Sequence, residues 1–161
     1  MLIDGREGRG IEESGGGSVM PKVIDMEVPE ISDLNGVVQI LEEAREIILP
    51  VGRWTQVYMA RAGGVRGRSV HSSDKDADCW CAIGAITKAC SELGLAPSAR
   101  VGAEVVFQNQ LPAEKTGDGR HYHMSIAQWN DVKNRRKGEV IAKFDAAIKV
   151  ARELAGAGVS A

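Results

Sequence analysis

At 161 residues, the chain is long enough for one domain with its own hydrophobic core and short for two. Its 20 basic and 22 acidic residues give a formal net charge of −2, which argues against a protein that binds polyanions through its overall charge. No apolar run approaches the roughly 18–20 residues that a membrane-spanning helix needs, and the N-terminus lacks a secretory signal pattern.

The N-terminal stretch is rich in glycine and poor in apolar residues. Six glycines fall within residues 1–19, so little side-chain surface is available to offset the entropy of ordering the backbone. We therefore expect a disordered tail over residues 1–21, a folded domain over 22–156 and a loose C-terminal tail over 157–161.

Two segments show clear helical periodicity. Apolar residues recur at helical spacing behind Asp33, a good N-cap residue, and the pattern stops at Pro50, which predicts a helix over about 34–49. A second apolar stripe predicts a helix over about 79–93, with Asp78 as its N-cap and Gly94 at its end.

The second half of the chain also has segments with helical features. Residues 98–111 have mixed features and favour a helix, whereas 112–123 contain proline and Gly-Asp-Gly and indicate a loop. A short helical turn is expected over 126–129 and a long amphipathic helix over about 137–155. The sequence thus predicts an all-α fold, a small single-domain bundle of about four to five helices.

Four short motifs occur in a fixed order along the chain. They are Arg53-Trp54-Thr55-Gln56, Trp80-Cys81-Ala82-Ile83-Gly84-Ala85, Trp129-Asn130-Asp131 and the closing run from Glu139 to Ile148. In these motifs the chain resembles, over roughly residues 34–150, an uncharacterised family of small bacterial and phage proteins. The resemblance implies relatives but no reaction, since that family has no assigned activity. Members tend to follow Trp-Asn-Asp with Gly-Arg-Thr, whereas residues 134–137 read Asn-Arg-Arg-Lys here.

The cysteines offer one catalytic hypothesis. Cys81 is expected in the first turn of a helix, where unpaired N–H groups favour a thiolate. His121 or His123 could act as its base, oriented by Asn130 or Asp131. Against this, the acids just before the cysteine oppose a thiolate, and an unpaired cysteine is most often a small buried residue.

The same residues could instead bind zinc, since Cys79, Cys81, His121 and His123 supply four competent ligands. Two cysteines two positions apart on a helix diverge by about 200°, however, because a turn holds 3.6 residues. No metal or other cofactor is therefore expected. The odd number of cysteines, two of them too close to form a useful disulfide, favours a reducing, cytoplasmic location.

Two further features could serve binding. Basic residues at 133–137 could contact nucleic acid, although a solvated helix end explains such a run equally simply. Trp54, Trp80 and Trp129 could line a pocket with Asn130 and Asp131 as its polar floor, or could instead anchor the core. We expect a non-catalytic, intracellular accessory domain that binds a protein or small molecule. A cysteine-dependent hydrolase or transferase and a nucleic-acid-binding protein remain the alternatives.

Overall fold

The computed structural model describes residues 33–158, so the tail expected at 1–21 and residues 159–161 of the tail expected at 157–161 lie outside this range. Residues 157 and 158, expected in the loose tail, belong to the last helix instead. Helix α1 (Leu34–Ile48) begins where the Asp33 carboxylate accepts a 2.7 Å hydrogen bond from the Gly36 N–H, and it ends just before Pro50. Its apolar stripe is buried, so the helix predicted over 34–49 is confirmed.

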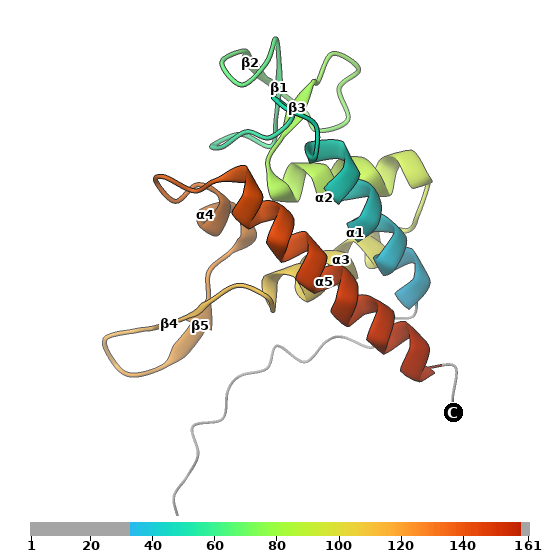
Figure 1. Ribbon diagram of the computed structural model, residues 1–161, viewed down its shortest axis with the longest axis vertical. Coiled ribbons are helices and arrows are strands. Elements are labelled where there is room, and N and C mark those ends of the chain that lie inside the picture. Colours follow the sequence, from blue (N-terminus) through green and yellow to red (C-terminus); the bar gives the residue numbers. More distant parts are fainter. Residues whose placement is uncertain (1–32, 159–161) are drawn as a thin grey trace, which may run out of the picture.

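The core lies between α1 and three further helices, α2 (Ala82–Leu93), α3 (Pro97–Gln108) and α5 (Lys137–Gly158), with the short α4 (Ile126–Asn130) at one side. In Figure 1, α5 crosses the molecule beside α1. Phe107 packs against the tilted ring of Phe144 with ring centroids 4.6 Å apart, and it makes an edge contact with Trp129 at 6.1 Å between centroids. The helices predicted near 98–111, 126–129 and 137–155 are thus confirmed with small changes of boundary.

The all-α prediction is wrong, because the described residues also form two small antiparallel sheets. Strands β1 (Ala60–Ala62), β2 (Arg68–Val70) and β3 (Cys79–Trp80) form one sheet in the order β2-β1-β3. Strands β4 (Ala113–Lys115) and β5 (His121–His123) form a hairpin in the segment expected to be a loop. Strands of two or three residues are too short to show an alternating pattern, so only their pairing with distant segments defines them.

The start of α2 shows how the error arose. Cys79 and Trp80, expected in the first helical turn, instead pair with Arg61 and Ala60 of β1, and Cys81 is the N-cap. The Asp78 carboxylate, expected to cap α2, accepts hydrogen bonds from the Gly63 and Gly64 N–H groups at 2.9–3.0 Å. A carboxylate binds the exposed N–H groups of a tight turn as readily as those of a helix.

The two sheets occupy different places. Figure 1 shows the three-stranded sheet at the end of the helical body near the start of α2, whereas the β4–β5 hairpin projects from another side. No helix within residues 33–158 has both the length and the apolar character needed to cross a membrane.

Candidate functional site

Asn130 joins three separate segments at the sheet end of the domain. Its side chain is fully buried, and its Oδ1 accepts hydrogen bonds from Trp54 Nε1 at 2.9 Å and from the Ala82 N–H at 3.2 Å. Its Nδ2 donates to the Thr55 carbonyl at 3.2 Å and to Asp131 Oδ1 at 2.8 Å. A side-chain amide offers two donors and two acceptor sites, so the hydrogen-bonding capacity of Asn130 is fully used within the chain. We call these four bonds the Asn130 clamp.

Asp131 holds the next part of the same loop. Its Oδ1 also accepts a 2.8 Å hydrogen bond from the Val57 N–H, and Gln56 Nε2 donates to the carbonyls of Asn130 at 2.7 Å and Val132 at 3.2 Å. Val57 has a φ of +74°, a conformation that a β-branched residue rarely adopts. Backbone strain of this kind costs on the order of 1–3 kcal/mol and persists only where surrounding contacts impose it.

The strained loop opens onto a pocket of about 400 Å³. The residues that line it are Trp54, Thr55, Gln56, Val57, Arg61 and Val65. Large apolar side chains beside it are exposed to solvent, namely Val57 (68%), Tyr58 (44%) and Val65 (48%). We call Val57, Tyr58 and Val65, together with Arg61, the 57–65 face.

The three tryptophans have different surroundings. Trp54 uses its Nε1 in the Asn130 clamp and turns the rest of its half-buried ring to the pocket. Trp80 is 3% exposed and donates to the Ser72 carbonyl at 2.8 Å, while Trp129 is 2% exposed and lies under the Arg135 guanidinium. The structure therefore brings Trp54, Asn130 and Asp131 together beside the pocket and places Trp80 and Trp129 in the core.

Cys81, the suggested nucleophile, is buried at the N-terminus of α2. Its Sγ accepts a 3.4 Å hydrogen bond from the Gly84 N–H, and only 4% of the residue is exposed. Burial is the main reason why the pKa of the Cys81 thiol is raised to about 11, and the carboxylate of Asp131 adds to the increase. The helix N-terminus, which was expected to favour a thiolate, is therefore outweighed by desolvation.

The histidines lie on the other sheet. His121 pairs with Lys115 and His123 with Ala113 in the β4–β5 hairpin, and His123 Nδ1 is 3.2 Å from the Leu111 carbonyl oxygen. In Figure 1 this hairpin lies away from the junction of β3 and α2, which carries Cys79 and Cys81. Among the described residues, no group of three or more histidine, cysteine or acidic side chains is placed to bind a metal ion.

Cys81 allows a first test. We expect the Cys81 thiol to resist alkylation in the folded protein at neutral pH, because a thiol with a pKa of about 11 is only about one part in 10⁴ thiolate at pH 7. A raised thiol pKa favours folding below the ordinary pKa of 9.0, and this contribution is lost as the pH rises from 9 towards 11.

The measurement is mass spectrometry after timed alkylation, together with urea unfolding across the same pH range. Cys81→Ser is the matched control, because a serine hydroxyl can cap α2 while removing the titrating thiol. Above pH 9, the free energy of unfolding of Cys81→Ser should therefore decrease less than that of the wild type. Fast, selective labelling of Cys81 at pH 7 would instead support the cysteine nucleophile.

Half of the basic run at 133–137 is engaged within the chain. Arg135 donates to the Trp129 carbonyl at 3.0 Å and pairs with Glu139, and Lys137 Nζ donates to the Leu49 carbonyl at 2.7 Å. These bonds fix the loop that leads from α4 into α5. Lys133 and Arg136 are exposed and leave only two cations turned to solvent in this run.

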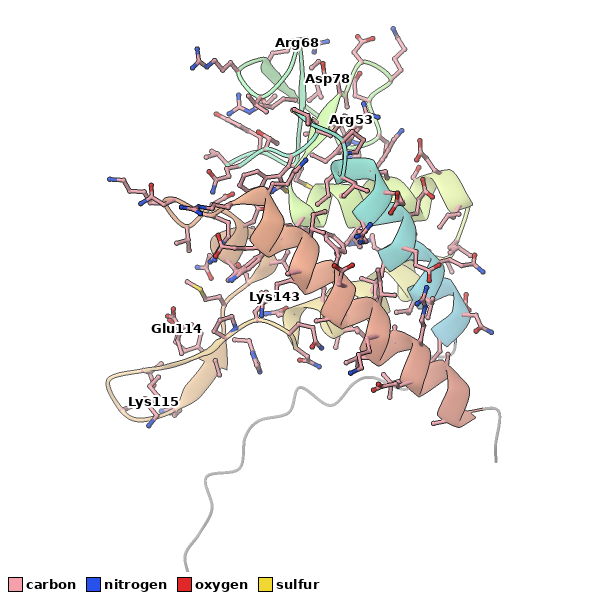
Figure 2. The ribbon with its side chains drawn as sticks, in the orientation of Figure 1. Arg53, Arg68, Asp78, Glu114, Lys115 and Lys143 are labelled. Atoms are coloured by element: carbon pink, nitrogen blue, oxygen red, sulfur yellow. The ribbon has the colours of Figure 1, made fainter. Side chains whose placement is uncertain are left out.

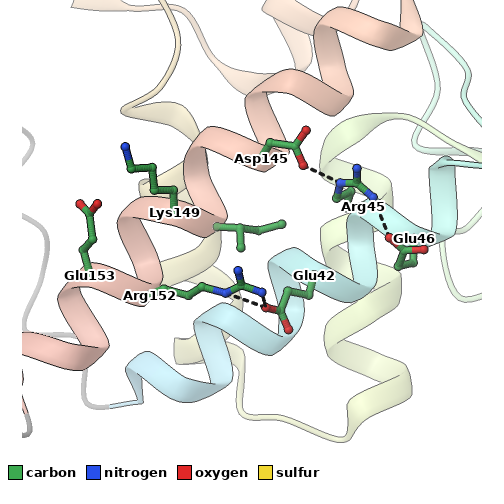
Figure 3. A pocket seen from close by; sticks show the side chains of 8 residues that line it. Glu42, Arg45, Glu46, Asp145, Lys149, Arg152 and Glu153 are labelled. Atoms are coloured by element: carbon green, nitrogen blue, oxygen red, sulfur yellow. Dashed lines mark hydrogen bonds and ion pairs between the residues drawn. The ribbon is translucent and has the colours of Figure 1, made fainter.

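A larger groove of about 600 Å³ lies between α1 and α5, shown in Figure 3. Four of its charged residues pair across the two helices, Arg45 with Asp145 at 2.6 Å and Arg152 Nε with Glu42 at 3.0 Å. Exposed pairs of this kind contribute little to stability, typically below about 1 kcal/mol each. Seven of the eight residues that line the groove are charged, and none of them is an exposed large apolar residue like those of the 57–65 face.

The sequence motifs led to Trp54, Asn130 and Asp131, but they did not indicate Val57, Tyr58, Arg61 or Val65. Only one sequence signal bears on these residues, the apolar run Val57-Tyr58-Met59 directly after the Arg53–Gln56 motif. Such a run is compatible with a buried element, and nothing local shows that its side chains stay in solvent.

Fold and site together define a small domain of helices and two short sheets, in which an asparagine clamp holds a strained loop at the edge of a pocket. The chain belongs to the Family of unknown function (DUF6197), whose model matches residues 34–150. The match confirms the expected family of unknown function over this range, whereas the motifs and the bacterial or phage origin stay predictions. No curated protein and no solved structure matched the chain in the corresponding comparisons.

Proposed function

We propose that this domain is a non-catalytic binding module that docks another protein on the 57–65 face. The observation that carries the proposal is Val57, a β-branched residue in a left-handed conformation with 68% of its surface exposed. Glycine or asparagine fits such a conformation at little cost, whereas valine does not. Strain that the fold maintains at an exposed apolar side chain is a reason to seek its role in a contact.

The composition of the face supports the proposal. Tyrosine, tryptophan and arginine are enriched where protein interfaces are buried most tightly, and Tyr58, Trp54 and Arg61 lie together here. The pocket is wide enough for one or two side chains of a partner, which would fit an anchor beside Val57 and Val65. The clamp and the Asp131 bond hold the loop before binding, so less ordering entropy is lost on association.

A test needs a probe that presents many side chains. We expect the full 161-residue chain, immobilised, to enrich peptides with a large apolar residue from a random-peptide display library. Addition of an enriched peptide should shift the backbone amide NMR signals of residues 54–65 and 131–132. Failure to enrich any peptide, or shifts confined to the groove between α1 and α5, would falsify the proposal.

Val57→Gly gives the proposal a distinctive pair of effects. Removing the strain should raise the free energy of unfolding by about 1 kcal/mol, since glycine adopts positive φ readily. Removing the isopropyl group should lower the affinity for the enriched peptide at least about tenfold, as for a typical interface anchor. Urea unfolding and a peptide titration measure the two effects.

Val101→Gly is the matched control, because Val101 is also exposed (42%) but lies on α3. There the same substitution should lower the free energy of unfolding by about 0.5 kcal/mol through its lower helix propensity and leave binding unchanged. Equal effects of the two variants on binding would contradict a contact at Val57.

A further inference from the structure

Arg61 is a cation at the pocket that has no anionic partner among the described residues. Its Nη1 donates to the Gly67 carbonyl at 2.8 Å, and its guanidinium lies 4.4 Å from the centre of the Tyr58 ring. Its buried Nε finds no acceptor within residues 33–158. A partly buried charge is usually paired or fully hydrogen-bonded, so this arrangement calls for an explanation.

We infer that Arg61 forms an ion pair with a carboxylate of the docked protein. The partner segment would then carry an aspartate or glutamate next to the apolar side chain that enters the pocket. This inference rests on the proposed docking function and names the chemistry of the partner. A guanidinium binds a carboxylate through two parallel N–H donors and keeps its charge at any physiological pH.

The charges around the pocket favour an acidic partner. Arg53 and Arg66 also lack a carboxylate partner among the described residues, and Arg53 instead packs on the Trp80 ring at 5.2 Å. Asp78, directly before β3, already accepts bonds from two backbone N–H groups, and Asp131 Oδ1 accepts from the Val57 N–H and from Asn130 Nδ2. Figure 2 shows Arg53, Arg68 and Asp78 at this end of the molecule.

Nucleic acid fits these observations less well than an acidic protein segment. Arg68 is paired with Asp76 at 3.3 Å, which leaves fewer free cations for the successive phosphates of a nucleic acid. Trp54, Val57 and Val65 form the apolar part of the pocket lining, and the two exposed valines offer nothing to a sugar-phosphate backbone. This apolar part, with Arg61 as the one cation of the lining, suits an apolar side chain followed by a carboxylate.

The test repeats the peptide selection and adds a substitution on each side of the contact. The wild-type chain should enrich peptides with Asp or Glu at a fixed distance from the apolar residue. Arg61→Gln should lose the acidic preference and bind the wild-type peptide about tenfold more weakly. Exchanging the peptide acid for its amide should weaken binding to the wild type by a similar factor and have no further effect on Arg61→Gln.

Two controls separate this contact from a structural role of Arg61. Arg66→Gln removes an exposed charge from the turn between β1 and β2 and should keep the acidic preference. A peptide without the acid should bind Arg61→Gln and wild type equally, whereas a collapsed loop would weaken both peptides alike and overturn the inference.

The remaining outcomes are distinct. Peptides that require Val57 but show no acidic preference would overturn the carboxylate contact and leave the docking function standing. Peptides that do not require Val57 would overturn both proposals. Salt-sensitive binding of a single-stranded oligonucleotide that is lost in Arg61→Gln would replace the protein partner with nucleic acid.

Discussion

Replacement of Asn130 with alanine is expected to lower the free energy of unfolding by about 4 kcal/mol, since each buried polar group left without a partner costs roughly 1–3 kcal/mol. The substitution leaves the Trp54 Nε1–H, the Ala82 N–H and the Thr55 carbonyl without their bonds. Solvent cannot easily replace the amide, because the Asn130 side chain is fully buried.

The measurement is urea unfolding followed by circular dichroism. The slope of the unfolding free energy against urea concentration should be the same in the variant and the wild type, so that only stability differs. Asn109→Ala is the matched control, because the Asn109 side chain makes no hydrogen bond among the described residues and lies at the end of α3. It should change the free energy of unfolding by less than about 0.5 kcal/mol. A cost below about 1 kcal/mol for Asn130→Ala would show that the clamp does not hold the loop to the helices.

Asn130→Asp separates the acceptors of the clamp from its donors. The new carboxylate could still accept from Trp54 and Ala82, but it would face the Thr55 carbonyl and the Asp131 carboxylate without a proton to donate. We therefore expect this variant to be less stable at pH 8 than at pH 4, where a protonated carboxyl group restores one donor.

The helices could be predicted from the sequence because their information is local. Each turn of α1 and α5 repeats an apolar residue, and Asp33 and Pro50 mark the ends of α1 within a few positions. The strands could not, because Cys79-Trp80 extends the apolar pattern of α2 on its N-terminal side. Only the β1 segment, about twenty positions earlier in the chain, determines that these two residues form a strand.

The candidate site divides in the same way. Trp54, Asn130 and Asp131 stood out in the sequence because they lie in distinctive motifs, and the structure brings them together through hydrogen bonds across 76 sequence positions. The conformation of Val57 had no local signal, because a valine by itself favours negative φ. Asp131 and Gln56 impose it from outside, and the exposed face depends on that distant contact.

The second large effect is expected at Gly84, in the first turn of α2. In an ordinary helix, replacing glycine with alanine stabilises the protein by up to about 1 kcal/mol. A Cβ at position 84, however, would lie 1.9 Å from the Met59 carbonyl oxygen and 2.8 Å from its carbon. The same carbonyl accepts a 3.1 Å hydrogen bond from the Cys81 N–H, so moving it away breaks that bond.

We therefore expect Gly84→Ala to lower the free energy of unfolding by about 3 kcal/mol, from overpacking and a lost backbone hydrogen bond. Gly138→Ala, in the first turn of α5, is the matched control, since nothing lies within 4 Å of its new methyl group. The control should leave the protein as stable or slightly more stable. Stabilisation by both variants would show that the loop can move away from α2.

Because Met59 follows Val57 and Tyr58 directly, the same substitution also tests how the 57–65 face is held. The N-terminus of α2 packs closely against the Met59 carbonyl, and the Asp131 carboxylate accepts a hydrogen bond from the Val57 N–H. The loop that carries the 57–65 face is therefore held at two points. Gly84→Ala removes the first support and leaves the second. At a low temperature at which Gly84→Ala is folded, it should bind the enriched peptide more weakly than Gly138→Ala does, although no side chain of the face has changed. An unchanged affinity would show that Asp131 and the Asn130 clamp position the 57–65 face without help from α2.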